Sequence, residues 1–312
     1  MANVQFGLEV PCDGLDKSRR HLYMEDVNHL LNYVKGHYDS AWVIDHLQFG
    51  DGDVLEGWTT LAYLSALHPE LLWGHTVLCQ SFRNPALVAK MGATLQLMSG
   101  GRFTLGIGAG WNEEEYAAYG YGFPPAGTRV EQLDEALRII KAMWIQETTT
   151  FEGKHYRVKE AWCEPKPDPL PTIMVGAFRP KMLRQAARHA DWWNVSSTGI
   201  EEYRTYLRAF ERACEDVGRD PRTVRLTWSG GCVCAPTERG LQELASGRLQ
   251  IGEGMAYQVG EDFVGTPGQI IEQMQPFIEL GVDYFIVDCG GFPRLTTVEM
   301  LVNEVMPAIE RL

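Results

Sequence analysis

The sequence predicts an α/β protein whose strands and helices form a closed (β/α)8 barrel, a TIM barrel with insertions. Short apolar runs recur along the 312 residues, a segment of helical period follows each run, and there are eight such pairs. A barrel of this kind takes about 250 residues, so the surplus should lie in insertions. An open, doubly wound sheet is the alternative fold. One domain over 1–312 is expected, because no repeat or break in composition marks a boundary.

The expected strands are short runs of apolar, β-branched or aromatic residues, and the expected helices carry apolar residues at a period near 3.6. The strands lie at 4–10, 40–44, 72–78, 103–107, 172–175, 191–195, 223–228 and 284–288. The helices follow them at 25–35, 57–67, 85–97, 129–144, 180–189, 201–217, 267–280 and 296–311.

Several helix boundaries have a local cause. Pro85, Pro180 and Pro267 each stand in a first helical turn, where a missing N–H costs nothing and the fixed φ is already helical. Gly281 follows the helix 267–280 as its expected stop.

Three stretches exceed what a barrel needs and are expected insertions: 116–127, 147–170 and 236–261. The second contains two β-prone runs around Gly153, which indicates a hairpin, and continues into a proline-rich connection.

The charge balance limits the classes of partner. With 28 Lys and Arg against 41 Asp and Glu, the formal charge is −13, so the mean field repels nucleic acid and anionic membranes. A phosphorylated cofactor can still bind through backbone amides and helix ends. The segment Met1–Gly7 lacks the pattern of a secretory signal, and no apolar run is long enough to span a membrane. A cytoplasmic protein acting on a small molecule is expected.

The cysteines indicate a reducing compartment. There are seven, an odd number, scattered without a C-x-x-C pair. Cys232 and Cys234 alternate as on a strand and would share one face, where they could hold a metal or simply pack. Packing is favoured, because a buried free cysteine behaves as a small hydrophobic residue.

Catalytic groups of such barrels lie at the carboxyl ends of strands, which directs attention to Asp45 and His46. An imidazole can exchange a proton near neutral pH, and an adjacent acid can fix its tautomer or raise its pKa. The alternative is a histidine that only satisfies a local hydrogen bond.

Two later strand ends are rich in glycine. Gly108-Ala109-Gly110 follows the strand 103–107, and Gly176-Ala177-Phe178 precedes the helix at Pro180. Glycine lets the backbone approach a ligand closely, and an open helix start suits a phosphate. A tight turn or an ordinary cap without a ligand is the alternative for each.

Other motifs add little. The turn at 265–268 is interpreted as ordinary capping, with a phosphate site as the alternative. Nucleophile elbows, H-E-x-x-H pairs, Walker loops and calcium loops are not found in the sequence, so hydrolase and metalloenzyme readings lack support. No metal site is predicted.

Taken together, these segments resemble the bacterial luciferase-like superfamily of flavin-type oxidoreductases, and within it the group that uses the deazaflavin coenzyme F420. The likeness covers nearly the whole chain, and its segments are specific only in combination. It is densest at 41–46, 74–77, 82–86, 97–113, 171–194 and 264–267.

The resemblance implies roles for particular residues. In the superfamily the ring lies at the carboxyl mouth of the barrel, with the counterparts of Asp45 and His46 beside its reactive carbon as catalytic and cofactor-binding residues. Gly108-Ala109-Gly110 resembles the loop that approaches the cofactor side chain, and Gly176-Ala177-Phe178 resembles the phosphate-binding turn. Thr76 and Val77 match a cofactor-binding position where the family has a non-prolyl cis peptide. The substrate would contact the variable insertions.

Three functions follow from the resemblance. The first is hydride transfer between F420 and a small organic substrate, in either direction, and Asp45-His46-Leu47 resembles the F420 group in particular. The second is an FMN-dependent monooxygenase that works with a partner flavin reductase. The third is a barrel that binds flavin without catalysis. The resemblance also implies a homodimer.

Overall fold

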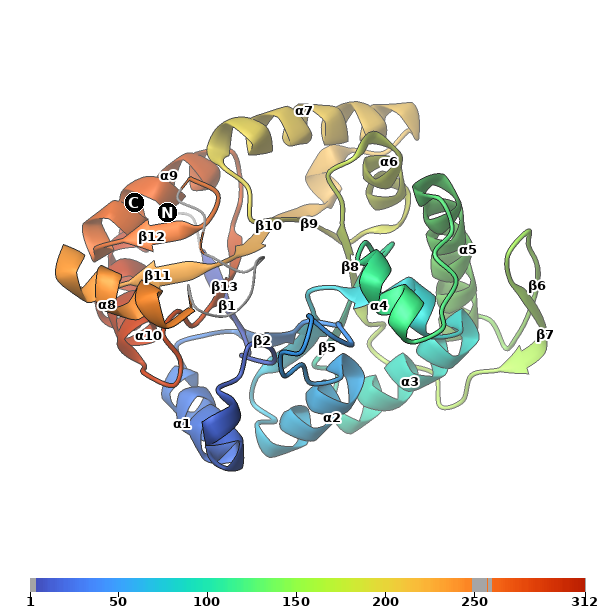
Figure 1. Cartoon of the computed structure of the whole chain (residues 1–312). Coiled ribbons are helices and arrows are strands. Elements are labelled where there is room, and N and C mark those ends of the chain that lie inside the picture. The colour runs from blue at the N-terminus through green and yellow to red at the C-terminus, as the bar shows by residue number, and fades with distance from the viewer. Residues whose placement is uncertain (1–3, 249–256, 258–259, 312) are drawn as a thin grey trace.

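The eight predicted strands form one closed parallel barrel in the computed structural model, which describes residues 4–248, 257 and 260–311 (Figure 1). Around the barrel the strands are β1 (Gln5–Glu9), β2 (Ser40–Val43), β3 (Leu72–His75), β5 (Phe103–Gly108), β8 (Thr172–Gly176), β9 (Trp192–Ser196), β10 (Arg225–Gly230) and β13 (Tyr284–Asp288). β1 pairs with both β2 and β13, and β3 pairs with β5, so the sheet has no open edge there. The open, doubly wound alternative is therefore wrong.

Helices cover the outside of the barrel, each following the strand with which it was predicted (Figure 1). They are α1 (Tyr23–Val34), α2 (Gly57–Leu67), α3 (Pro85–Met98), α5 (Ala126–Ile145), α6 (Pro180–His189), α7 (Ile200–Asp216), α9 (Pro267–Glu279) and a last helix built from α10 (Thr296–Met300), a π-helical turn at Leu301–Val305 and α11 (Met306–Ile309). The prolines predicted to begin α3, α6 and α9 do so. Gly281 has φ +96° just after α9, which confirms it as the stop.

The insertions are partly as predicted. The stretch 147–170 contains the antiparallel hairpin of β6 (Thr148–Glu152) and β7 (Arg157–Trp162), which stands outside the ring of helices (Figure 1). The stretch 116–127 is shorter than predicted, because α5 already begins at Ala126 and its first turn takes over the last two residues.

The stretch 236–261 contains α8 (Glu238–Arg248), while 249–256 and 258–259 lie outside the described residues. Around it, β11 (Cys232–Cys234) and β12 (Phe263–Gly265) form a small parallel sheet that was not predicted. Both cysteines of β11 are fully buried, as the packing interpretation predicts. The strand predicted at 223–228 begins later, because Pro221–Thr223 forms a short 3-10 turn.

Large side chains fill the interior of the barrel. Trp42, Met174, Tyr284 and Ile286 are buried there and pack on one another. A Cβ atom at Gly74 would lie 2.5 Å from Cζ3 of Trp42, so glycine at this position makes room for the indole. Because the interior is full, a ligand can enter only at an end of the barrel. Within the described residues, no helix is both long and apolar enough to cross a bilayer.

Candidate active site

A cavity of about 680 Å³ opens at the carboxyl ends of β2, β3, β5, β8 and β9. All of the residues predicted for the site line it, although they come from four separate parts of the chain. They are Asp45, His46, Thr76, Val77, Gly108, Ala109, Gly110, Gly176, Ala177 and Phe178.

His46 is paired with Glu115, a residue that the sequence did not single out. Nδ1 of His46 lies 2.8 Å from Oε1 of Glu115, and the other carboxylate oxygen accepts the N–H of Leu47. An ionised carboxylate only accepts hydrogen bonds, so this contact places the imidazole proton on Nδ1 and leaves Nε2 for a substrate. Burial opposes ionisation of Glu115, but the hydrogen bonds from His46 and Leu47 outweigh it and keep its pKa below its ordinary value.

Asp45 does not orient His46, contrary to the prediction from their adjacency. Its buried carboxylate accepts both guanidinium nitrogens of Arg83 at 2.8 Å, and Oδ2 also accepts the N–H of Cys79 at 2.9 Å. The two adjacent side chains therefore have different partners, Arg83 for Asp45 and Glu115 for His46. The carboxylate that contacts the imidazole is therefore Glu115 and not Asp45, and a catalytic role of Asp45 stays a prediction. The role of Asp45 in cofactor binding stays a prediction.

Glu115 had a weak signal in the sequence. It is the third residue of the acidic run Glu113-Glu114-Glu115, which begins the short helix α4 (Glu113–Ala118) directly after the glycine loop. Glu113 and Glu114 are exposed, whereas Glu115 is buried. Nothing in a run of three identical residues tells which one turns inward, so only the coordinates identify the partner of His46.

The peptide bond between Thr76 and Val77 is cis, as predicted. The strand predicted at 72–78 is interrupted here, since β3 ends at His75 and pairing resumes at β4 (Leu78–Cys79). Val77 thereby projects toward two glycines. A Cβ atom at Gly108 would lie 2.8 Å from Cγ2 of Val77, and one at Gly176 would lie 3.3 Å from both of its methyl groups. These glycines make room for Val77, a reason different from the predicted close approach to a ligand.

The amino end of α6 opens onto the cavity. Arg179 is its N-cap and forms no side-chain capping bond, so the N-cap side chain does not occupy the first-turn N–H groups. The N–H of Ala177 instead donates to the carbonyl of Asn194 at 3.0 Å, so within the predicted phosphate turn this amide is already used. Arg179 and Lys181 also line the cavity at this end.

The turn before α9 is an ordinary cap, as interpreted from the sequence. Thr266 and Gln269 form a reciprocal capping box. The Thr266 side chain accepts the backbone N–H of Gln269, and the Gln269 side chain accepts the backbone N–H of Thr266. The residues of this turn are not among those that line the cavity.

The fold and this cavity define a (β/α)8 barrel with its candidate site at the carboxyl ends of the strands. Comparison with known proteins then identifies the family. The model of the luciferase-like monooxygenase family matches residues 35–263, so the chain belongs to that family.

Two curated relatives are similar over most of their length, and a third over about half. An F420-dependent glucose-6-phosphate dehydrogenase from Microbacterium testaceum is 34% identical over 302 residues, covering 88% of this chain and 90% of the relative. One from Intrasporangium calvum is 27% identical over 322 residues, covering 92% and 95%. An F420-dependent hydroxymycolic acid dehydrogenase from Mycobacterium tuberculosis is 33% identical over 188 residues, covering 59% and 52%.

Solved structures share the fold. An F420-dependent secondary alcohol dehydrogenase has a TM-score of 0.82 at 19% identity, with 98% of this chain and 99% of that chain covered. A monooxygenase from Streptomyces bottropensis has a TM-score of 0.83 at the same identity and coverage. At this identity the likeness establishes the barrel fold and no shared substrate.

Proposed function

We propose that this protein is an F420-dependent oxidoreductase that transfers a hydride between the deazaflavin and a small organic substrate. The observation that carries the proposal is that one cavity gathers the His46–Glu115 pair, the Val77 side chain and the uncapped amino end of α6. Support comes from the curated relatives, which are named as F420-dependent dehydrogenases.

The residues of the cavity fit such a cofactor. Its volume of about 680 Å³ lies in the range of small-molecule and cofactor sites. Val77, held in the space that Gly108 and Gly176 leave, offers an apolar surface on which a planar ring would rest. The first turn of α6, with Arg179 and Lys181, would hold a phosphate in a chain whose net charge is otherwise −13.

The chemistry divides between the cofactor and the chain. When bound, a deazaflavin supplies a carbon that carries hydride in place of the flavin N5. The chain supplies the proton transfer: Nε2 of His46 takes the proton of a substrate hydroxyl or returns it to a carbonyl oxygen. Glu115 keeps Nδ1 protonated and stabilises the imidazolium that forms.

The FMN monooxygenase is the second candidate, and the match to the model of the luciferase-like monooxygenase family favours it. Titration of the purified protein with F420 and FMN separately, followed by absorbance, decides between them. We expect a dissociation constant for F420 in the micromolar range or below, at least ten times lower than that for FMN. Preference for FMN would contradict the proposal. Tight binding without turnover of any substrate would leave the non-catalytic barrel.

A homodimer in the cytoplasm is the finer part of the proposal. Four large apolar side chains on α2 and α3 are each at least 48% exposed: Leu67, Leu87, Leu97 and Met98. Their exposure supports a dimer in which a second copy of the chain packs against these helices. Light scattering during size-exclusion chromatography should give twice the mass of 35.1 kDa, and a monomer mass would contradict it.

A further inference from the structure

The charged side chains that line the cavity differ between its α6 end and its His46 end. Arg179 and Lys181 lie at the α6 end, whereas Arg129 of α5 lies beside the glycine loop, where it donates to the carbonyl of Gly110. At the His46 end the carboxylates of Asp45 and Glu115 line the cavity, and the exposed Glu113 and Glu114 lie outside its lining, at the start of α4. An anionic group is therefore attracted to the end assigned to the cofactor phosphate and repelled from the end where the proton is transferred.

The His46 end is also aromatic. The centroid of the His46 ring lies 4.5 Å from that of Phe49 and 5.6 Å from that of Trp111. Its geometry with the indole is edge-to-face. Trp111 lines the cavity, yet 67% of its surface is exposed. A molecule bound beside His46 would cover this indole, and removal of its apolar surface from water would favour binding.

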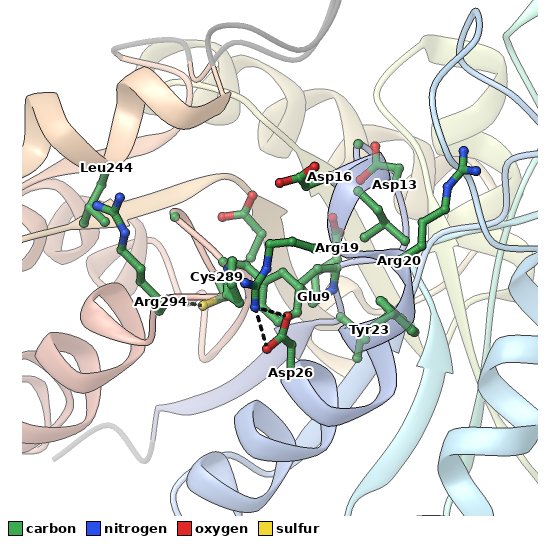
Figure 2. A pocket seen from close by; sticks show the side chains of 18 of the residues that line it. Glu9, Asp13, Asp16, Arg19, Arg20, Tyr23, Asp26, Leu244, Cys289 and Arg294 are labelled. Atoms are coloured by element: carbon green, nitrogen blue, oxygen red, sulfur yellow. Dashed lines mark hydrogen bonds and ion pairs between the residues drawn. The ribbon is translucent and has the colours of Figure 1, made fainter.

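A second cavity of about 260 Å³ lies at the same end of the barrel, beside the ends of β1 and β13 (Figure 2). Glu9 and Asp288, which are paired in register, both line it. Figure 2 shows the Arg19 guanidinium directed at Asp26, to which it is bonded at 2.9 and 3.1 Å. Of the described residues lining this cavity, six carry carboxylates and three carry guanidinium groups. The lining of this second cavity thus also has a formal net negative charge.

We infer that the substrate is an uncharged alcohol or carbonyl compound with an apolar group beside its reacting carbon, and that Trp111 determines this preference. The inference rests on the proposed function and names its substrate class. Oxidation breaks the C–H bond, whose electron pair leaves as a hydride to the deazaflavin. The hydroxyl proton passes to Nε2 of His46, and a C=O bond forms. Reduction of the carbonyl reverses each step. Phosphorylated sugars, named for several relatives, should be poor substrates.

Acetophenone and 4-acetylbenzoate test the role of charge, since they present the same ketone and differ by one carboxylate. Dissociation constants of both, and of glucose 6-phosphate, are measured for the protein saturated with F420, and turnover is followed with reduced F420. We expect acetophenone to bind at least ten times more tightly than either anion. Equal or tighter binding of an anion, or no binding of acetophenone at millimolar concentration, would overturn the inference.

Two variants assign the preference to residues. Trp111→Ala should weaken acetophenone binding about tenfold without changing the dissociation constant of F420, while Trp162→Ala, a tryptophan 60% exposed on β7, should change neither. The double variant Glu113→Gln/Glu114→Gln should reduce the ratio between the dissociation constants of 4-acetylbenzoate and acetophenone. The control Glu215→Gln/Asp216→Asn removes the same charge from the carboxyl end of α7, at the opposite end of the barrel. It should leave the ratio of the two dissociation constants unchanged.

The outcomes separate the two levels of the proposal. If F420 does not bind, the proposed function fails, and the two ketones measured without cofactor still report the charge preference of the mouth. If F420 binds while Trp111→Ala leaves acetophenone binding unchanged, the role of Trp111 is wrong and the proposed function stands.

Discussion

Among single residues, His46 has the environment of a proton-transfer group. Glu115 holds one nitrogen of the imidazole, and the rings of Phe49 and Trp111 flank it. Only 19% of the His46 side chain is exposed, so a bound substrate would leave little room for water at Nε2. This arrangement restricts both the tautomer and the direction of the ring, as a general acid or base requires.

His46→Asn should lower kcat by about 100-fold or more while the fold survives, because a positioned side chain that transfers a proton typically contributes 10²- to 10⁴-fold. Single-turnover absorbance of the cofactor measures the rate, and circular dichroism and thermal unfolding serve as controls. Unchanged turnover would remove His46 from the mechanism, whereas a variant that does not fold would indicate a structural role.

Gly108→Ala should weaken F420 binding, because the new Cβ atom would lie 2.8 Å from Cγ2 of Val77 and force that side chain into the space of the ring. Val77→Ala removes the obstructing methyl groups, so Gly108→Ala/Val77→Ala should recover part of the lost affinity. Titration with F420 measures all three variants. A double variant no better than Gly108→Ala would show that the glycine serves another purpose.

Among the secondary-structure elements, an ion cluster joins three that surround the site. Arg83, which precedes α3, is bonded to Asp45 at the end of β2 and to Glu56, the N-cap of α2. Asp45 also accepts the N–H of Cys79 in β4. The cluster therefore holds the chain before His46 and the chain after Val77 against the same helix start, and Arg83 acts as a positioning residue for both.

Arg83→Met should cost about 3 to 5 kcal/mol of unfolding free energy, because it leaves the buried Asp45 carboxylate without its counter-ion. Urea unfolding measures the loss. Arg222→Ala is the matched control: its side chain is 88% exposed in its pair with Asp220, so removal should cost no more than about 1 kcal/mol. Equal losses in both variants would contradict a special role for Arg83.

The elements also show how far local patterns carry a prediction. Apolar runs located every barrel strand, and prolines located three helix starts, since both are local causes. The pairing of β11 with β12 was missed because the two short strands are separated by α8. Within the site, strand-end placement found His46, but its partner Glu115 lies 69 residues away. The domain bounds 1–312 stay a prediction.

For the whole molecule, stability should fall below neutral pH because of His75. Burial lowers its pKa to about 4, although the nearby Asp45 carboxylate opposes the shift. The ordinary value is about 6.5, so between pH 6.5 and 4 the unfolded chain binds a proton that the native protein does not. This contribution is complete above pH 6.5 and is lost as the pH falls, up to about 3 kcal/mol.

Unfolding free energies measured from pH 7 to 4.5 test this for the wild type and His75→Gln. As the pH falls, the unfolding free energy of the wild type should decrease more steeply than that of the variant. A pH-independent difference between the two proteins does not affect this comparison of slopes. His21→Gln alters an exposed imidazole and should run parallel to the wild type. Parallel curves for His75→Gln would refute the assignment.

The pairing of β1 with β13 also concerns the synthesis of the chain. Phe6 lies opposite Phe285, so the first strand of the barrel can complete its pairing only after the last strand has been synthesised. At typical translation rates of 5–20 residues per second, roughly 15 to 55 s separate their emergence from the ribosome. Throughout that interval the edge of β1 that pairs with β13 is left without a partner strand, and in a chain stopped before β13 it stays so. We therefore expect a stalled nascent chain to be a client of chaperones, and the released, full-length chain to lose that dependence as the barrel closes.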